Sequence, residues 1–200
     1  MISAPFQRTA KTTLAIAALL ALAGCLTTPP STMLRLSRMS PLEADPAAIR
    51  LAARLPGPLR VRDGDIRLRI SFDGGTAATR LVEEYGAVVV EAPAGTPGIG
   101  DDAEGSRTYV AALTPDDAAS LADVQRRIRS WRAAGIEGEG QLSVMATACA
   151  EGPVPDGPIR LTTWMRTAPD DSFFVLTRNA DLRRQIGDGT LAQIGRCGAG

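Results

Sequence analysis

The chain has 200 residues, with 22 Lys+Arg, 22 Asp+Glu and no histidine, so its formal net charge is zero. This balance excludes the basic excess that marks a nucleic-acid-binding protein. Lys11 is the single lysine. If Lys11 belongs to a removed targeting segment, the working chain has neither histidine nor lysine. It then lacks histidine as the commonest general base and metal ligand, and lysine as the Schiff-base amine and the phosphate-loop residue. A hydrolase with a histidine-containing triad is therefore excluded, and we expect no cofactor.

The N-terminus is typical of a targeting segment. Arg8 and Lys11 precede an uncharged run of 13 residues, 12–24. A basic start, a short apolar stretch and small residues at its end are typical of a secretory signal peptide. The run is too short to cross a bilayer core of about 30 Å, which takes about 20 helical residues. A buried N-terminal helix is the alternative, and the preceding charges and the following Pro29-Pro30 argue against it.

The apolar run ends in Leu22-Ala23-Gly24-Cys25, which resembles the lipobox of bacterial lipoproteins. The resemblance implies cleavage before Cys25, a diacylglycerol on its sulfur and acylation of the new amino terminus. Two or three acyl chains would anchor the protein stably, because one chain alone binds marginally. Leu26 stands where an aspartate would imply retention in the inner membrane, so the resemblance implies the periplasmic face of the outer membrane, with the inner membrane as the alternative. An ordinary cleavage site with a nearby cysteine is the other interpretation.

The sequence thus predicts three parts. Residues 1–24 form a cleaved signal peptide, residues 25–31 a lipidated tether and residues 32–200 a single periplasmic domain. The mature chain would have 176 residues with 20 arginines and 22 acidic residues, a formal net charge of −2. This length is enough for one domain with its own core.

Two further cysteines are predicted to form a disulfide. With Cys25 assigned to lipid, Cys149 and Cys197 remain as an even pair in an oxidising compartment. Closing a loop of about 49 residues would stabilise the fold by about 4 kcal/mol in the chain-entropy model. Two separate buried thiols are the alternative. Two cysteines without histidine do not complete a zinc site, so no metal site is predicted there.

The first half of the domain carries one strong β signal. Residues 33–39 weakly favour a strand, and Asp45-Pro46 favours a short helix that ends at Pro56-Gly57-Pro58. Asp63-Gly64 then lies between two runs of alternating apolar residues, which predicts a hairpin with a two-residue turn. The turn would pair Val61 with Ile66 and Leu59 with Leu68.

The predicted hairpin would gather four arginines on its other face: Arg60, Arg62, Arg67 and Arg69. Guanidinium groups match phosphate and carboxylate geometry, so these side chains are candidates to bind anionic lipid, lipopolysaccharide phosphates or an acidic partner. The alternative is a solvated sheet face neutralised by Asp65, Asp73 or Glu83.

The best helix signal lies in the second half. Thr114 as cap, Pro115 at the first position and a stripe of Leu121, Val124, Ile128 and Trp131 predict an amphipathic helix over about 115–134 that lies across a sheet. Strands are expected within 79–90, with 87–90 the more buried part, and at 106–113, 141–148, 159–166 and 173–176. Residues 92–105 are expected to form an exposed loop, and Asn179 to cap a last short helix. The order predicts an α+β fold, an antiparallel sheet or sandwich with this main helix and one or two short helices.

Three weaker patterns could indicate chemistry, but each also has a non-functional explanation. Carboxylates for a glycosidase-like cell-wall hydrolase could come from Glu83, Glu84, Glu91, Glu137, Glu139 and Glu151, none of which lies in a motif. Asp101, Asp102 and Glu104 could bind calcium weakly, although solvated acids are expected. Trp164, Met165, Phe173 and Phe174 could line a lipid pocket, although core packing is expected.

The leading functional hypothesis is a lipid-anchored envelope protein with a structural or adaptor role, without catalysis. It would contact the membrane through its anchor, could hold an envelope protein partner and would not bind nucleic acid. The alternative is a binding module for lipid or another anionic envelope molecule such as a glycolipid, accessory to transport. A carboxylate-based cell-wall hydrolase is the third hypothesis.

Overall fold

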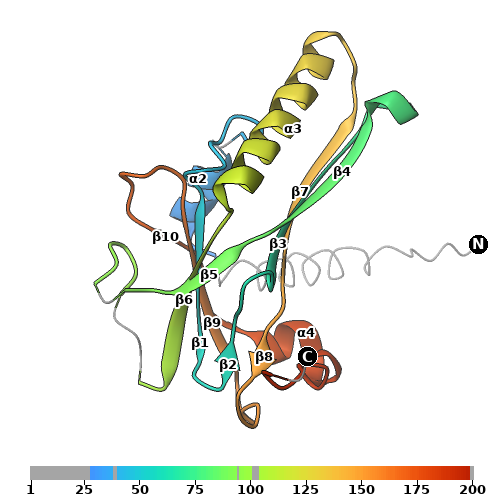
Figure 1. Cartoon of the computed structure of the whole chain (residues 1–200). Coiled ribbons are helices and arrows are strands. Elements are labelled where there is room, and N and C mark those ends of the chain that lie inside the picture. The colour runs from blue at the N-terminus through green and yellow to red at the C-terminus, as the bar shows by residue number, and fades with distance from the viewer. Residues whose placement is uncertain (1–27, 38–39, 94, 101–103, 199–200) are drawn as a thin grey trace, which may run out of the picture.

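The protein has an α+β fold, as predicted. The computed structural model describes residues 28–37, 40–93, 95–100 and 104–198. Within these ranges ten strands form three antiparallel sheets, accompanied by three α-helices and one 3-10 turn, Ala77–Thr79. The main helix, α3 (Pro115–Ala133), lies along the smaller of the two larger sheets (Figure 1).

The largest sheet has the strand order β10-β9-β1-β6-β5. Its strands are β1 (Arg50–Pro56), β5 (Val88–Glu91), β6 (Ser106–Ala112), β9 (Arg160–Arg166) and β10 (Phe174–Asp181). The central strand β1 pairs with β6 on one side and with β9 on the other. Small side chains suit this position, and Ala52 is 2% exposed.

The second sheet has the order β4-β3-β7, with β3 (Ile66–Asp73) between β4 (Arg80–Gly86) and β7 (Glu139–Ala146). The chain passes from β4 into β5 with only Ala87 between them, so one extended segment joins the two larger sheets. β2 (Leu59–Arg60) and β8 (Cys149–Ala150) form a short third sheet near α4 (Leu182–Leu191) and the C-terminus (Figure 1).

Helix α3 packs on the β4-β3-β7 sheet through its apolar stripe. The Thr114 hydroxyl accepts a hydrogen bond from the backbone N–H of Asp117 at 3.1 Å, and Pro115 occupies the first position, as predicted. Ile128 is 2% exposed and lies in one cluster with Ile70 and Phe72. Trp131 is partly buried against this cluster and stacks on Phe72 at a centroid distance of 5.6 Å.

The prediction of a short helix after Asp45-Pro46 was wrong, because the segment forms the central strand β1. The Asp45 carboxylate does accept a hydrogen bond from the N–H of Ala47 at 2.9 Å, but only a turn follows. Two neighbouring strands offer β1 hydrogen bonds on both sides, and these pairings outweigh the helix propensity of its alanines and leucines.

The weak prediction of a strand over 33–39 was also wrong. Residues Pro30–Ser37 form helix α2, which therefore begins inside the segment expected to be a tether. Pro30 has the fixed φ that suits a first helical position. The Thr32 hydroxyl donates a hydrogen bond to the carbonyl of Val175 and ties this helix to β10.

The hairpin predicted at Asp63-Gly64 does not form. β2 pairs with β8, while β3 pairs on its two sides with β4 and β7, so no edge of β3 remains for β2. The aspartates of this segment make other hydrogen bonds. The Asp65 carboxylate accepts one from the backbone N–H of Arg62 at 2.8 Å, and the Asp63 carboxylate accepts one from the backbone N–H of Val89 at 2.6 Å. Local turn residues alone do not select a strand's partner.

Two smaller expectations also need correction. Asn179 lies within β10 with a φ of 49°, and the cap of α4 is Asp181, whose carboxylate accepts from the N–H of Arg183 at 3.1 Å. Asparagine tolerates the left-handed region that this irregular stretch of β10 requires. Residues 87–90 are less buried than expected, because Val90 is 60% exposed. The other predicted strands and the loop over its described residues are present, although Ile99 in that loop is buried.

No helix among the described residues is long and apolar enough to span a membrane. The predicted signal peptide and Cys25 lie outside the described residues.

Candidate functional site

Strand β7 has one free edge. It pairs with β3 along its whole length, and no strand of the described chain pairs with its other side. Its eight residues, EGQLSVMA, include no proline or lysine, and their single charge is Glu139 at the first position. Natural sheets usually protect long edge strands with such residues or with covering segments. The β7 edge is therefore open to pairing with another chain.

The face of β7 that points toward α3 is apolar yet exposed. Leu142 is in register with Ile70, and Val144 with Leu68. Leu142 is 41% exposed and Val144 is 51% exposed, while Ile70 is 3% exposed. Helix α3 covers the side chains of β3 and β4, which form the core beneath it. The side chains on the same face of β7 lie outside this core and are left uncovered by the helix.

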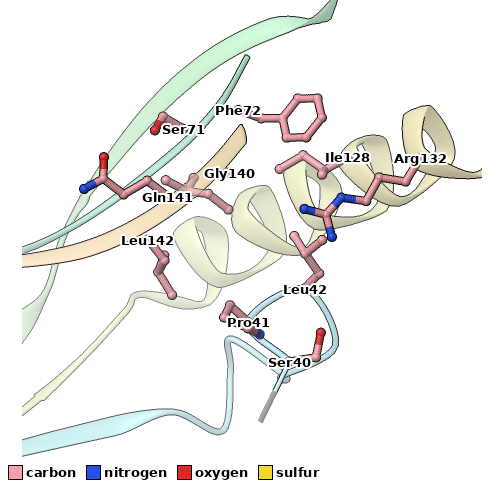
Figure 2. A pocket seen from close by; sticks show the side chains of 11 residues that line it. Ser40, Pro41, Leu42, Ser71, Phe72, Ile128, Arg132, Gly140, Gln141 and Leu142 are labelled. Carbon is pink, nitrogen blue, oxygen red and sulfur yellow. The ribbon is translucent and has the colours of Figure 1, made fainter. Parts of the chain in front are cut away.

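A pocket of about 190 Å³ opens at this face of β7. Figure 2 shows its lining, which comes from the 40–42 segment, β3, α3 and β7. The lining residues are Ser40, Pro41, Leu42, Ile70, Ser71, Phe72, Ile128, Arg132, Gly140, Gln141 and Leu142. We call the pocket together with the exposed side chains of Leu142 and Val144 the β7 groove.

Gly140 leaves this pocket open. A Cβ at position 140 would lie 3.6 Å from Phe72 Cδ2 and 3.7 Å from Arg132 Nη2, which are ordinary contact distances. A larger side chain at position 140 would therefore extend into space bounded by Phe72 and Arg132. The absence of a side chain here matters more than backbone freedom, because Gly140 is not among the glycines with positive φ.

The apolar surface continues along the same sheet face. A smaller hollow of about 40 Å³ has Val144 in its lining, together with Ile49, Leu51, Ile66, Leu68 and Leu113. Because Leu142 and Val144 are two residues apart on β7, their side chains point to the same face. The two hollows thus follow one strand.

Arg132 brings a positive charge to the pocket. Its guanidinium carbon lies 5.9 Å from the centroid of the Phe72 ring, and Figure 2 shows the side chain reaching from α3 toward Leu42 and Ile128. Among the described residues Arg132 forms no ion pair. The groove therefore combines apolar walls with one guanidinium group.

The four arginines expected to share a hairpin face are not brought together in that way. Arg60 lies on β2 with its Nε 2.7 Å from Glu151, Arg62 in a loop beside Asp65, and Arg67 on β3 with Nη1 3.1 Å from Glu84. Arg69 is exposed on the outward face of β3, in register with Glu84 and Ser143. Three of the four have a carboxylate partner, which fits the interpretation of a neutralised surface. Of the acids expected to neutralise them, only Asp65 does so, because Asp73 pairs with Arg80 and the other partners are Glu84 and Glu151.

Glu151 forms ion pairs with two arginines and accepts a hydrogen bond from one of them, Arg107. Its Oε2 lies 2.9 Å from Arg107 Nη1 and its Oε1 lies 2.7 Å from Arg60 Nε. The hydrogen bond from Arg107, with a smaller contribution from Arg60, lowers the pKa of the Glu151 carboxyl. A glycosidase general acid needs a raised pKa, so Glu151 is perturbed in the opposite direction.

The remaining carboxylate candidates lie on separate elements. Glu83 and Glu84 are on β4, Glu91 ends β5, Glu137 is in the loop after α3 and Glu139 begins β7. Asp101 and Asp102 lie outside the described residues, and Glu104 is exposed at the start of a turn. The described residues contain no group of three or more acidic or cysteine side chains placed to hold a metal ion.

The aromatic residues considered for a lipid pocket lie mainly in the core. Trp164 and Phe173 are 4% and 7% exposed and form one cluster with Ala52 and Ile99. The guanidinium of Arg54 lies over the Trp164 ring at 5.0 Å. Met165 and Phe174 are register partners on β9 and β10. This arrangement supports the core interpretation.

The outward face of the β4-β3-β7 sheet carries a second concavity, of about 580 Å³. Its lining combines polar residues with apolar ones such as Val82, and it includes Asp73 and Arg80, which form an ion pair at 2.8 Å. The N–H of Gly75 and then Arg80 hold the pKa of Asp73 below its usual range. Asp73 and Arg80 thus neutralise each other on this face of the sheet.

The disulfide predicted between Cys149 and Cys197 is present, with an S–S distance of 2.07 Å. The β7 groove, in contrast, was missed by the sequence analysis. Residues 139–146 do carry a signal: apolar residues alternate with polar ones, and a glycine occupies one inward position. That pattern predicts a strand, but it does not reveal that one side of the strand is free.

No protein-family model matches the sequence, no curated protein matches it, and no solved structure matches the fold.

Proposed function

We propose that this protein is a lipid-anchored envelope adaptor on the periplasmic face of the outer membrane, and that it holds a partner protein through the β7 groove. In this role the chain binds and positions its partner without catalysis. The observation that carries the proposal is the edge of β7 that no described strand pairs with, beside exposed apolar side chains and an apolar pocket.

The N-terminal sequence supports the cellular address. Its lipobox-like ending, Leu22-Ala23-Gly24-Cys25, supports a lipid on Cys25, and Leu26 supports the outer membrane. The Cys149–Cys197 disulfide is the kind of bond that persists in an oxidising compartment such as the periplasm. A tether at Cys25 would keep the domain near the membrane while leaving β7 free for a partner.

The size of the pocket favours a protein partner over a lipid. Sites for whole small molecules usually have volumes of about 300–1,000 Å³. The β7 pocket has about 190 Å³, which is closer to the roughly 150 Å³ cavity that accommodates one benzene ring. It therefore suits one apolar side chain. An unprotected strand edge next to such a pocket is the arrangement used for strand addition, where backbone hydrogen bonds supply affinity and the pocket supplies specificity.

Site-specific photo-crosslinking in intact cells tests the proposal. A photoreactive amino acid replaces Leu142 in the groove, and in a second strain it replaces Val82, which is 50% exposed on the outward face of the same sheet. We expect a discrete protein adduct, identified by mass spectrometry, from Leu142 and none from Val82. The Gly140→Val substitution, which fills the pocket, should remove the adduct.

Three outcomes would contradict the proposal. Equal adducts from both positions would indicate unspecific contact, and absence of any adduct from Leu142 would indicate that nothing occupies the groove. A lipid-sized mass increase at Leu142 would favour the alternative of a lipid-binding module.

A further inference from the structure

We propose that the partner contributes an extended segment that pairs with β7, places a large apolar side chain over Gly140 and directs a carboxylate to Arg132. This inference rests on the proposed adaptor function and specifies the chemistry of the partner. It identifies Gly140 and Arg132 as the residues that determine specificity.

The backbone of β7 supplies the first part of the recognition. In an antiparallel sheet, alternate residues of an edge strand direct their N–H and C=O groups away from their neighbour. β7 is in continuous register with β3 from Glu139 to Ala146, without a bulge. A partner strand would find a regular ladder of donors and acceptors along this length.

The pocket selects the side chain at one position of that strand. Side chains directly opposite each other on neighbouring strands have Cβ atoms about 4.5–5.5 Å apart. Opposite Gly140 there is no Cβ to meet, so a large side chain can lie across the glycine and enter the pocket between Leu42 and Leu142. Covering of an edge glycine by a cross-strand aromatic side chain is a known stabilising arrangement in sheets. The position opposite Gly140 therefore suits phenylalanine or another large apolar residue.

Arg132 selects a carboxylate near that side chain. Its Nη2 would lie 3.7 Å from a Cβ at position 140, so the guanidinium borders the space that the partner's side chain fills. Neighbouring arginines on α3 have partners: Arg126 pairs with Asp123, and Arg129 donates to the carbonyl of Leu42. On an extended strand the next residue on the same face lies about 7 Å away, within reach of a long side chain. A glutamate there could accept two hydrogen bonds from Arg132.

A second copy of this chain fits the groove less well. If β7 paired with β7 of another molecule, the residues facing the groove would be Gly140, Leu142, Val144 and Ala146. None of these carries a charge, so both copies of Arg132 would remain without a carboxylate. Charge complementarity thus favours a different, acidic and apolar segment.

Peptide binding to the full chain, purified in detergent, tests the inference. The probe is a short fluorescent peptide with blocked ends. Threonine occupies every second position, and valine, phenylalanine and glutamate occupy the positions between, so that these three share one face of the strand. Two versions are made, one with phenylalanine before glutamate and one with glutamate before phenylalanine. Comparison peptides replace glutamate by glutamine or phenylalanine by alanine. Fluorescence anisotropy gives the dissociation constants.

We expect the glutamate peptide to bind at least about tenfold more tightly than either comparison peptide. Gly140→Val should weaken binding at least about tenfold, as loss of the phenylalanine does. Arg132→Gln should remove the preference for glutamate over glutamine while leaving the glutamine peptide's affinity unchanged. Ser143→Val, on the outward face of β7 and outside the pocket lining, and Arg126→Gln, on the same helix, are the matched controls and should preserve binding.

Absence of binding by all peptides, or glutamate and glutamine peptides of equal affinity on the unaltered protein, would overturn the inference. Unchanged affinity in Gly140→Val would do the same, provided its melting temperature matches that of the unaltered chain. If the Leu142 adduct persists in cells while the peptide preference fails, only this inference is lost. An adduct with the mass of two copies of the chain would show that β7 pairs with a second copy, and it would overturn the inference of an acidic partner.

Discussion

Cys149 and Cys197 hold the C-terminal segment against β8. Their Cα atoms are 4.9 Å apart, and the N–H of Cys197 donates to the carbonyl of Ala150 at 3.0 Å. A parallel bridge between Ala150 and Arg196 continues this contact, and Leu191, which ends α4, is buried in the cluster around Leu59. The disulfide thus holds the segment that follows α4 against β8, the strand that comes after β7 in the chain.

The first prediction concerns the stability that this disulfide supplies. Replacing both cysteines, Cys149→Ser with Cys197→Ser, should lower the free energy of unfolding by about 4 kcal/mol, because the unfolded chain loses a constraint on a loop of about 49 residues. Urea unfolding followed by the fluorescence of Trp131 and Trp164 measures the change. A reducing agent should destabilise the unaltered protein to a similar extent and leave the double variant unchanged. An equal effect of reductant on both proteins would contradict the prediction.

The second prediction concerns Gly98, which packs against the backbone of Phe173. Gly98 has a φ of +83°, and a Cβ there would lie 2.2 Å from the Phe173 carbonyl oxygen. Gly98→Ala should cost about 3 kcal/mol or more, because it adds displacement of Phe173 from the core to the cost of a left-handed backbone. Gly95 is a matched control with a φ of +73° and no atom within 4 Å of its added Cβ.

Gly95→Ala should therefore cost only about 1–2 kcal/mol, the price of the left-handed conformation. Thermal unfolding measures both variants, and near-ultraviolet circular dichroism reports the packing around Trp164. Equal destabilisation by the two substitutions would show that the contact with Phe173 has no energetic weight.

The third prediction is a pH dependence at Glu151. Arg107 and Arg60 lower its carboxyl pKa below the ordinary value of 4.5. A lowered folded-state pKa contributes stability that is fully present above about 4.5 and is lost as the pH falls through the folded-state value. Glu151→Gln should therefore unfold at lower urea concentration than the unaltered protein near neutral pH, and the difference should shrink toward zero in acid.

Urea midpoints measured across this pH range provide the comparison. Glu137→Gln is a suitable control, because Glu137 is exposed and forms no ion pair with any described residue. A difference for Glu151→Gln that stays constant into acid would indicate that the effect does not come from the ionised carboxylate.

The fourth prediction concerns the membrane anchor. Cys25→Ser should move the protein from the membrane fraction to the soluble periplasmic fraction, because the acyl chains that hold it would be missing. The variant with Cys149→Ser and Cys197→Ser controls for loss of a cysteine in general and should remain with the membrane. Unchanged fractionation of Cys25→Ser, together with no acyl mass on the unaltered chain, would disprove anchoring.

The sequence predicted helix α3 well because all its signals are local. Thr114, Pro115 and the stripe at Leu121, Val124 and Ile128 act within one helix, where capping, backbone geometry and side-chain spacing agree. The alternating run that follows Asp63-Gly64 likewise predicted β3. The hairpin failed because its turn signal describes only the local chain, while β3 gained more hydrogen bonds from β4 and β7 than β2 could offer.

The sequence by itself determined the α+β class, the main helix with its buried stripe and the pairing of Cys149 with Cys197, and it predicts the anchor at Cys25. Strand order was decided only by the tertiary structure, because it depends on contacts between distant segments. The same is true of the β7 groove. Alternation makes residues 139–146 a strand, but only the strand order leaves one of its sides unpaired among the described residues, and only the packing of β3, α3 and the 40–42 segment around Gly140 forms its pocket.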